Sequence, residues 1–190
     1  MSRTFIEDQE FDKHDFVNNP LQKGEYENCR FLNCDFSTTD LSGQVFVECE
    51  FNSCNLSMTP VSDAAFREVR FSDCKMLGFR LDTCNPFMLK VRFENCQLNH
   101  SSCYRLKLKR TTFINCQLIE ADFVEGDLNL AVFDRCDLTG AVFENSILEG
   151  ADFRTSHGYT LDPEINHIHG AKFSRDGLEG LLHKYNIEVE

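Results

Sequence analysis

The sequence predicts an all-β domain in which short strands coil into a stacked, four-sided solenoid. An apolar residue occupies every fifth position over most of the chain, and Phe recurs every twenty residues. Neither spacing matches the helical period of 3.6 or the strand period of 2. A period of twenty made of four fives describes a coil with four short sides, and stacked coils place like residues above one another. We therefore expect about eight coils that are held together by contacts between neighbours.

The five-residue spacing runs from Ile6 to Leu81 with an apolar residue at each repeated position. It then slips by two residues and resumes at Phe93, and the intervening segment contains Pro86 and Phe87. The slip predicts a two-residue insertion in one coil. The twenty-residue period predicts one interior column of stacked rings. Its members are Phe11, Phe31, Phe51, Phe71, Phe93, Phe113, Phe133, Phe153 and Phe173.

The position two residues before each central residue is also selective. Small side chains dominate there, and nine of the ten cysteines occupy it. A small residue fits beside a large one in a narrow, close-packed interior. The other three positions of each five are mostly polar or charged, so we expect them to face solvent.

Two segments carry a family resemblance. Residues 121–128 (ADFVEGDL) and 141–148 (AVFENSIL) look like the A(D/N)LXX pattern of pentapeptide-repeat proteins. The resemblance extends over about residues 6–173. It implies the fold of that family, a right-handed quadrilateral parallel β-helix.

Within the family, the chain resembles the branch that protects DNA gyrase, which includes the Qnr-type quinolone-resistance proteins and the albicidin- and microcin-resistance proteins. Residues 68–78 (EVRFSDCKMLG) are similar to the middle of the albicidin-resistance type. The C-terminal tail is the second similarity. Ser174 is suited to N-cap a short α-helix, and the apolar residues that follow it have helical spacing.

The sequence therefore divides into residues 1–173, the β-helix, and residues 174–190, a helix and tail. In the resembled branch, an equivalent tail forms the dimer contact, and it would also cover the end of the solenoid. The resemblance thus implies a homodimer. The residues expected at the dimer contact are Leu178, Leu181, Leu182, Tyr185, Ile187 and Val189.

The resemblance also implies a function, because such proteins are acidic rods that imitate duplex DNA. The implied partner is a bacterial type II topoisomerase, DNA gyrase or topoisomerase IV, which the protein would protect from quinolones or peptide toxins. The alternative is a general interaction scaffold with another partner. The net charge of −12 argues against direct binding of nucleic acid, since phosphates attract basic proteins.

Charge is uneven along the chain. Residues 92–110 hold five bases against one acid, whereas residues 120–152 hold nine acids against one base. The acidic run is either an ordinary solvated surface or a stripe that faces the DNA-binding groove of a partner. Its members are Glu120, Asp122, Glu125, Asp127, Asp134, Asp137, Glu144, Glu149 and Asp152.

Cysteine and histidine both invite a metal interpretation. Cysteines at 34, 54, 74, 96, 116 and 136 recur at consecutive coils, close enough for disulfides. No Cys-x-x-Cys pair is present, so buried, reduced thiols are the favoured interpretation. His157, His167 and His169 lie close in sequence, but no fourth ligand is evident. We expect neither a metal nor a cofactor.

A solenoid with a filled interior offers no concave site for a small-molecule substrate, so we expect a binding protein and not an enzyme. The first residues show no secretory signal. No run of residues is apolar enough for a membrane span. We therefore expect a cytoplasmic protein that does not contact membranes.

Overall fold

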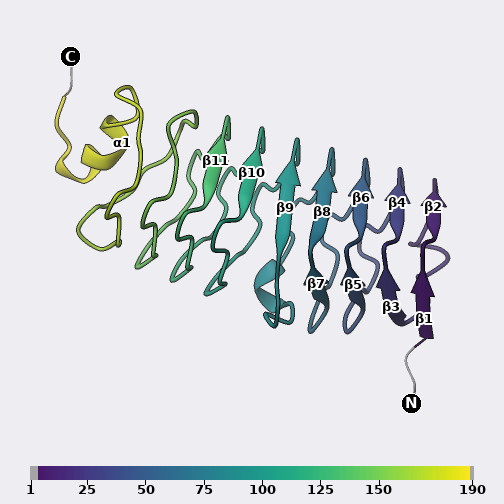
Figure 1. Ribbon diagram of the computed structural model, residues 1–190. Coiled ribbons are helices and arrows are strands. Elements are labelled where there is room, and N and C mark those ends of the chain that lie inside the picture. Colours follow the sequence, from purple (N-terminus) through teal and green to yellow (C-terminus); the bar gives the residue numbers. More distant parts are fainter. Residues whose placement is uncertain (1–3, 189–190) are drawn as a thin grey trace.

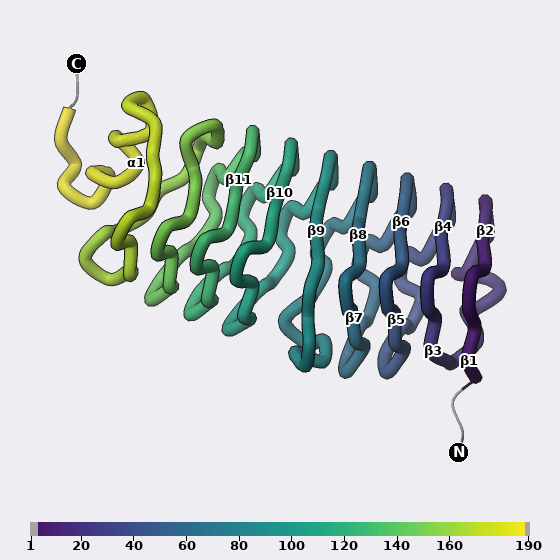
Figure 2. The backbone as a smooth tube through the Cα atoms, viewed as in Figure 1, coloured from purple at the N-terminus to yellow at the C-terminus, as the bar shows by residue number. Residues whose placement is uncertain are grey.

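A computed structural model describes residues 4–188. The chain forms a parallel β-solenoid whose coils stack along one axis, with the two ends of the chain at opposite ends of the rod (Figure 1). The smooth trace in Figure 2 shows the same coils as a series of stacked turns, each leading into the next. This architecture is the right-handed quadrilateral β-helix that the sequence predicts.

Two parallel sheets line two of the four sides. In each sheet, strands pair at an offset of twenty residues, so that Phe31 lies beside Phe51. The offset becomes twenty-two once, where Phe71 lies beside Phe93. One sheet contains β1 (Thr4–Glu7), β3 (Gly24–Glu27), β5 (Val45–Val47) and β7 (Ala65–Arg67). The other contains β2 (Glu10–Asp12), β4 (Arg30–Leu32), β6 (Glu50–Asn52), β8 (Val69–Ser72), β9 (Val91–Glu94), β10 (Thr112–Ile114) and β11 (Val132–Asp134).

The second sheet has seven strands, one for each regular turn, which is slightly fewer than the eight coils expected. Corners between sides recur every five residues and place one residue in the left-handed region. Leu130 has φ 57° and Gly150 has φ 66°. Turns of this kind need a positive φ. Non-glycine residues are held there by bonds between coils, such as Leu130 N–H to the carbonyl of Glu149 at 2.8 Å.

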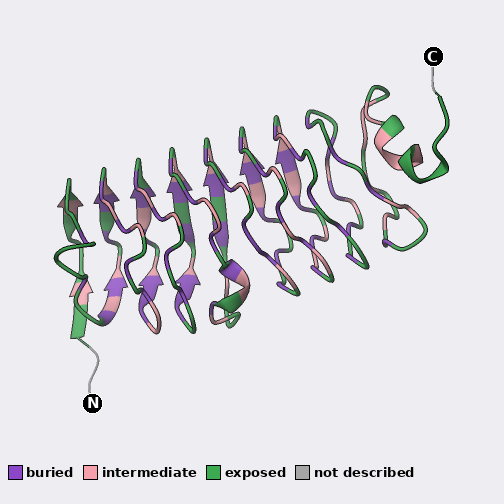
Figure 3. Ribbon diagram, turned by 180° about the vertical axis from the view of Figure 1, so that it is seen from behind, coloured by how far each residue is buried: buried purple, intermediate pink, exposed green. Residues whose placement is uncertain are grey.

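The interior is a set of stacked side-chain columns. The rings of Phe113 and Phe133 are 5.0 Å apart and nearly parallel, and the Phe column continues from Phe11 to Phe173 as predicted. Rings of neighbouring columns meet edge to face, as Phe113 and Phe123 do at 5.9 Å. Buried segments therefore line the inside of every coil, while the corners are exposed (Figure 3).

The cysteines form part of this core. All ten, which lie within the described residues, are buried and unpaired. The Cys54 thiol donates to the carbonyl of Phe31 in the preceding coil at 3.3 Å. Burial raises the pKa of Cys49 to about 12. A thiol with a raised pKa is a poor nucleophile and metal ligand. Burial of all ten thiols in the packed core favours their interpretation as small buried hydrophobes.

The two-residue slip projects outward. After a 3₁₀ turn, η1 (Leu81–Thr83), Asn85 still pairs with Ala65 of β7. The next bond to the preceding coil is delayed until the N–H of Lys90 reaches the carbonyl of Phe66 at 3.0 Å. The residues between them form a bulge, the 86–89 bulge, which interrupts the side that carries β7.

The C-terminal tail begins at Ser174, whose hydroxyl oxygen accepts a hydrogen bond from the N–H of Gly177 at 3.1 Å. The helix is short: α1 (Glu179–Leu182) passes directly into a 3₁₀ turn, η2 (His183–Tyr185). The tail folds against the last coil, where the carbonyl of Gly180 accepts a bond from the N–H of Leu161 at 3.0 Å. No helix within residues 4–188 has the length and apolar character to cross a membrane.

Candidate interaction surfaces

Four sides of the solenoid are open to solvent. We number them in chain order: side 1 carries the seven-stranded sheet, and side 4 carries the four-stranded sheet. Sides 2 and 3 lie between them and are formed by turns and single β-bridges. Each coil passes through all four sides within twenty residues, so residues that are close in sequence face different directions.

This geometry distributes the nine acidic residues at 120–152 around the rod. Asp134 and Asp152 extend from side 1 and Asp137 from side 2, while Glu120 lies at the corner between sides 2 and 3. Asp122 and Glu144 belong to side 3, Asp127 and Glu149 to side 4, and Glu125 to the corner between those two. The structure therefore places the nine in a ring around the axis and not in a stripe along one side. We call this ring the acidic collar.

Part of the acidic collar is paired with basic side chains. Six of its carboxylates lie within ion-pair distance of a basic group, including Glu125 with Arg105 at 2.7 Å and Asp152 with Arg154 at 2.7 Å. Hydrogen bonds from these guanidinium groups lower the pKa of both carboxyls. Glu144 and Glu149 have no ion pair among the described residues. The carboxylates without an ion pair leave the collar with a net negative charge.

A second acidic region lies at the N-terminal end. Residues 4–50 hold eleven acids against three bases. Some of these acids stack in register, as Glu7 and Glu27 do on side 4. On side 1, acids and bases alternate from coil to coil, so Arg30 contacts Glu10 at 3.0 Å and Glu50 at 3.7 Å.

Between the two acidic regions lies a basic one. Residues 65–110 hold ten bases against four acids, and we call this region the basic belt. The rod is therefore acidic at 4–50, basic at 65–110 and acidic again at 120–152. The basic run at 92–110 was visible in the sequence, but its extension to Arg67 and Arg70 was not. Both residues belong to the preceding coil: the offset of twenty-two places Arg70 beside Arg92, and Arg67 lies over the ring of Phe87.

The tail presents apolar side chains at the C-terminal end. Leu178, Tyr185 and Ile187 are each about half exposed, with fractions of 48, 52 and 56 %. Leu181 packs against the core and Leu182 is half-buried. Ile187 lies outside any regular element. The remaining residue expected at the dimer contact, Val189, lies outside the described residues.

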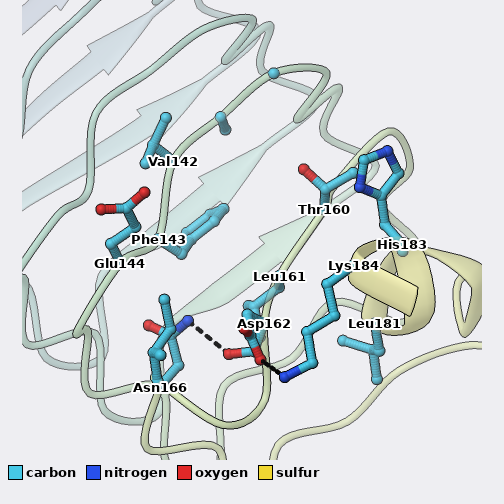
Figure 4. Close-up of a pocket in the computed structure, with 14 residues that line it drawn as sticks. Val142, Phe143, Glu144, Thr160, Leu161, Asp162, Asn166, Leu181, His183 and Lys184 are labelled. Carbon is cyan, nitrogen blue, oxygen red and sulfur yellow. Dashed lines mark hydrogen bonds and ion pairs between the residues drawn. The ribbon is translucent and has the colours of Figure 1, made fainter. Parts of the chain in front are cut away.

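Lys184 attaches the tail to the last coil. Its amino group lies 2.7 Å from Asp162 and 2.6 Å from Glu164, and the hydroxyl of Tyr185 also donates to Glu164 at 2.9 Å. Figure 4 shows the Lys184 side chain extending from the helix toward Asp162 across an open hollow. Desolvation opposes the charge of Lys184, but its bonds to the two carboxylates raise its pKa overall. The same bonds lower the pKa values of Asp162 and Glu164.

The histidines do not converge. His157 stacks on Asp137 on side 2, with 3.7 Å between its Nδ1 and the carboxylate, whereas His167 stacks on Ile147 on side 4. His169 follows His167 on side 4. No group of three His, Cys, Asp or Glu residues within 4–188 is arranged to hold a metal ion.

Comparison with known families agrees with the geometry. A model described as "Pentapeptide repeat region" matches residues 44–113 and 87–157, which together cover more than half of the chain. The chain belongs to the pentapeptide-repeat family. A search of curated proteins finds no match.

One solved structure shows the same fold, and two further solved structures are similar at lower scores. A trypsin-treated variant of QnrB1, described as a plasmid-mediated fluoroquinolone resistance protein, is 18% identical; the match covers 100% of this chain and 99% of that one, with a TM-score of 0.62. Full-length QnrB1 is 21% identical over 97% and 100% of the two chains, with a TM-score of 0.46. HetL, from the cyanobacterium Nostoc and involved in regulating heterocyst differentiation, is 16% identical over 93% and 90%, with a TM-score of 0.44.

Proposed function

We propose that this pentapeptide-repeat protein is a non-enzymatic, cytoplasmic binder of bacterial type II topoisomerase that imitates duplex DNA and protects the enzyme from quinolones or peptide toxins. Its fold is that of QnrB1, a fluoroquinolone resistance protein. The observation that carries the proposal is the density of negative charge around the axis of the rod.

The acidic collar occupies less than two coils. At the usual strand spacing of about 4.8 Å per coil, its length along the axis is about 8 Å. Nine acids against one base in that length give about one net negative charge per 1 Å. Residues 4–50, with eleven acids against three bases, give a similar value of about one per 1.4 Å. Duplex DNA carries about one charge per 1.7 Å. Counted along the sequence alone, both acidic regions therefore carry at least the linear charge density of duplex DNA.

The tail supports a homodimer. Leu178, Tyr185 and Ile187 expose apolar surface at one end of the rod, and a second copy of the tail would cover it. Such an end-to-end dimer places two acidic collars next to each other at its centre. Light scattering should give the mass of a dimer, and the double variant Leu178→Glu, Ile187→Glu should be monomeric with an unchanged far-UV spectrum. A monomeric parent protein would refute this arrangement.

The decisive experiment is a gyrase supercoiling assay with purified protein, with and without ciprofloxacin. Restored supercoiling in the presence of the drug would support protection. Inhibition without restoration would support mimicry of DNA alone. The variant Glu144→Gln, Glu149→Gln removes two unpaired charges of the collar and should weaken either effect. The matched variant Glu25→Gln, Glu27→Gln tests the other acidic region. No effect of the parent protein on gyrase or topoisomerase IV would refute the proposal.

The alternative is a scaffold of the same fold with a different partner. One observation favours it: the basic belt interrupts the two acidic regions, whereas duplex DNA is negative along its whole length. Capture of a non-topoisomerase protein that depends on the collar, together with an inactive supercoiling assay, would establish this alternative.

A further inference from the structure

The basic belt coincides with the outward bulge. Phe87 and Met88, in the 86–89 bulge, are exposed by 64 and 65 %, which are among the highest values for apolar side chains in the described chain. The guanidinium of Arg67, one coil earlier, lies 5.7 Å from the centre of the Phe87 ring. An apolar tip at the middle of the rod is thus in contact with a cation.

Further cations surround this tip. On side 1, Arg70 and Arg92 lie in register on β8 and β9. On side 4, Lys107 and Lys109 occupy the coil that follows the bulge, and Arg110 turns the corner toward side 1. The bulge therefore stands at an edge that is lined with basic side chains from three consecutive coils.

Several of these cations have no partner. Lys107 and Arg110 are exposed and have no ion pair among residues 4–188. Arg92 reaches Glu94 only at 3.9 Å. The Nε of Arg67 is buried without a hydrogen-bond partner. Arg70 and Lys109 are paired, with Glu50 at 3.3 Å and Asp127 at 3.1 Å. The cations without an ion pair leave the patch positive beside exposed apolar side chains, which suits an anionic partner.

The extent of the patch limits the kind of partner. From Arg70 to Arg110 the patch covers two coil steps, about 10 Å along the axis. Acidic regions lie beyond it in both directions. A long polyanion laid along the rod would enter these regions within about one Debye length of 8 Å and be repelled. A short acidic segment that carries one apolar side chain would not.

We propose that the basic belt and the 86–89 bulge form a second interaction surface, which binds a short acidic protein segment whose apolar side chain packs on Phe87 and Met88. This surface lies on different coils from the acidic collar. The two regions meet at the ion pairs Arg105–Glu125 and Lys109–Asp127, so the test changes residues without an ion pair among 4–188: Lys107 and Arg110 in the belt, and Glu144 and Glu149 in the collar.

The test uses the full-length protein and two fluorescent seven-residue probes. One is an acidic peptide with a central leucine, and the other has glycine at that position. Fluorescence anisotropy should show binding of the leucine peptide that weakens as salt is added. The variant Lys107→Glu, Arg110→Glu should weaken it about tenfold or more. The matched variant Lys23→Glu, Lys172→Glu changes two exposed, unpaired lysines outside the belt and should change affinity less than about twofold.

Phe87→Ser separates the apolar contact from the charge. It should weaken binding of the leucine peptide several-fold and leave binding of the glycine peptide unchanged, because only the leucine side chain packs on the apolar tip. Equal binding by all variants would overturn the proposal. Tighter, belt-dependent binding of an oligothymidylate than of the peptide would also overturn it and assign the surface to nucleic acid. Matching thermal midpoints of the variants show that any loss is not unfolding.

Discussion

The side chain of Gln44 accepts the backbone hydrogen bond of Gly24, which lies one coil earlier. Its Oε1 accepts a hydrogen bond from the Gly24 N–H at 2.8 Å, and its Nε2 donates to the carbonyl of Gln22 at 3.2 Å. A Cβ at position 24 would lie 2.5 Å from the carbonyl oxygen of Thr4, so glycine is required there. The buried Gln44 thus occupies an interior position that small residues fill in other coils.

Replacing Gln44 with alanine should therefore destabilise the protein by about 1–3 kcal/mol, since the Gly24 N–H would be left buried without a partner. Alanine fits the space, because Ala64 occupies the same position in the next coil. Denaturation midpoints would measure the effect. The exposed Gln97→Ala is the control and should change stability by less than about 0.5 kcal/mol. Equal midpoints for the two variants would show that the Gln44 bonds contribute nothing.

Truncation within the Phe column should be costly. Phe113 is fully buried between Phe93 at 5.3 Å and Phe133 at 5.0 Å. Phe113→Ala should cost about 3–5 kcal/mol, because the stacked coils on either side cannot collapse into the cavity. Phe87→Ala, at an exposed ring, is the matched control. An unchanged denaturation midpoint for Phe113→Ala would contradict the column as the source of stability.

The same substitution at two serines should act in opposite directions. Ser101 has a buried hydroxyl without a partner and lines a small void beside Cys103. The hydroxyl of Ser146 donates to the carbonyl of Phe123 at 2.7 Å. Ser101→Ala should stabilise by about 1 kcal/mol, and Ser146→Ala should destabilise by about 1 kcal/mol. Thermal midpoints that shift in the same direction would disprove the contrast.

Attachment of the tail should depend on pH at both extremes. The pKa values of Asp162 and Glu164 are lowered from 3.8 and 4.5. Their contribution to attachment of the tail is therefore complete above those values, and it is lost as the pH falls through the lower pKa values of the folded protein. The pKa of Lys184 is raised from 10.5, so its contribution is complete below that value and is lost as the pH rises through the folded one.

Between these limits the tail should remain attached. Methyl NMR signals of Leu181 would follow its release at either extreme. In the variant Lys184→Met, the alkaline transition should disappear, because no amino group remains to lose its proton. A transition of unchanged size in that variant would assign the effect to another group.

The interior was predictable because its period is fixed by geometry. Every fifth residue points inward regardless of the chemistry around it, and both the Phe column and the Cys column follow from counting. The side of the rod that each charged residue faces was harder to predict. Asp137 and Glu149 belong to one acidic run in the sequence, yet the coil carries them to sides 2 and 4. Counting charges by side within each twenty-residue period would have shown a ring.

The basic belt and the bulge were only partly predictable. The slip after Leu81 was evident, but its outward course depends on one bond, from Lys90 to Phe66, that leaves Phe87 unpacked. The short helix was expected, and its length was not. Its apolar spacing would suit a longer helix, but Leu161 binds the carbonyl of Gly180 and α1 ends at Leu182.

Because the coils stack in a uniform register, the number of coils between two regions sets the distance between them. Each coil bonds only to the coils before and after it, so insertion of one complete period after Thr111, between the basic belt and the acidic collar, would give every coil a matching neighbour. Such an insertion would move the two regions apart by about 4.8 Å and leave the residues of both unchanged. Evolution can thus set the distance between two recognition regions in fixed increments, by duplicating or losing twenty residues at a time.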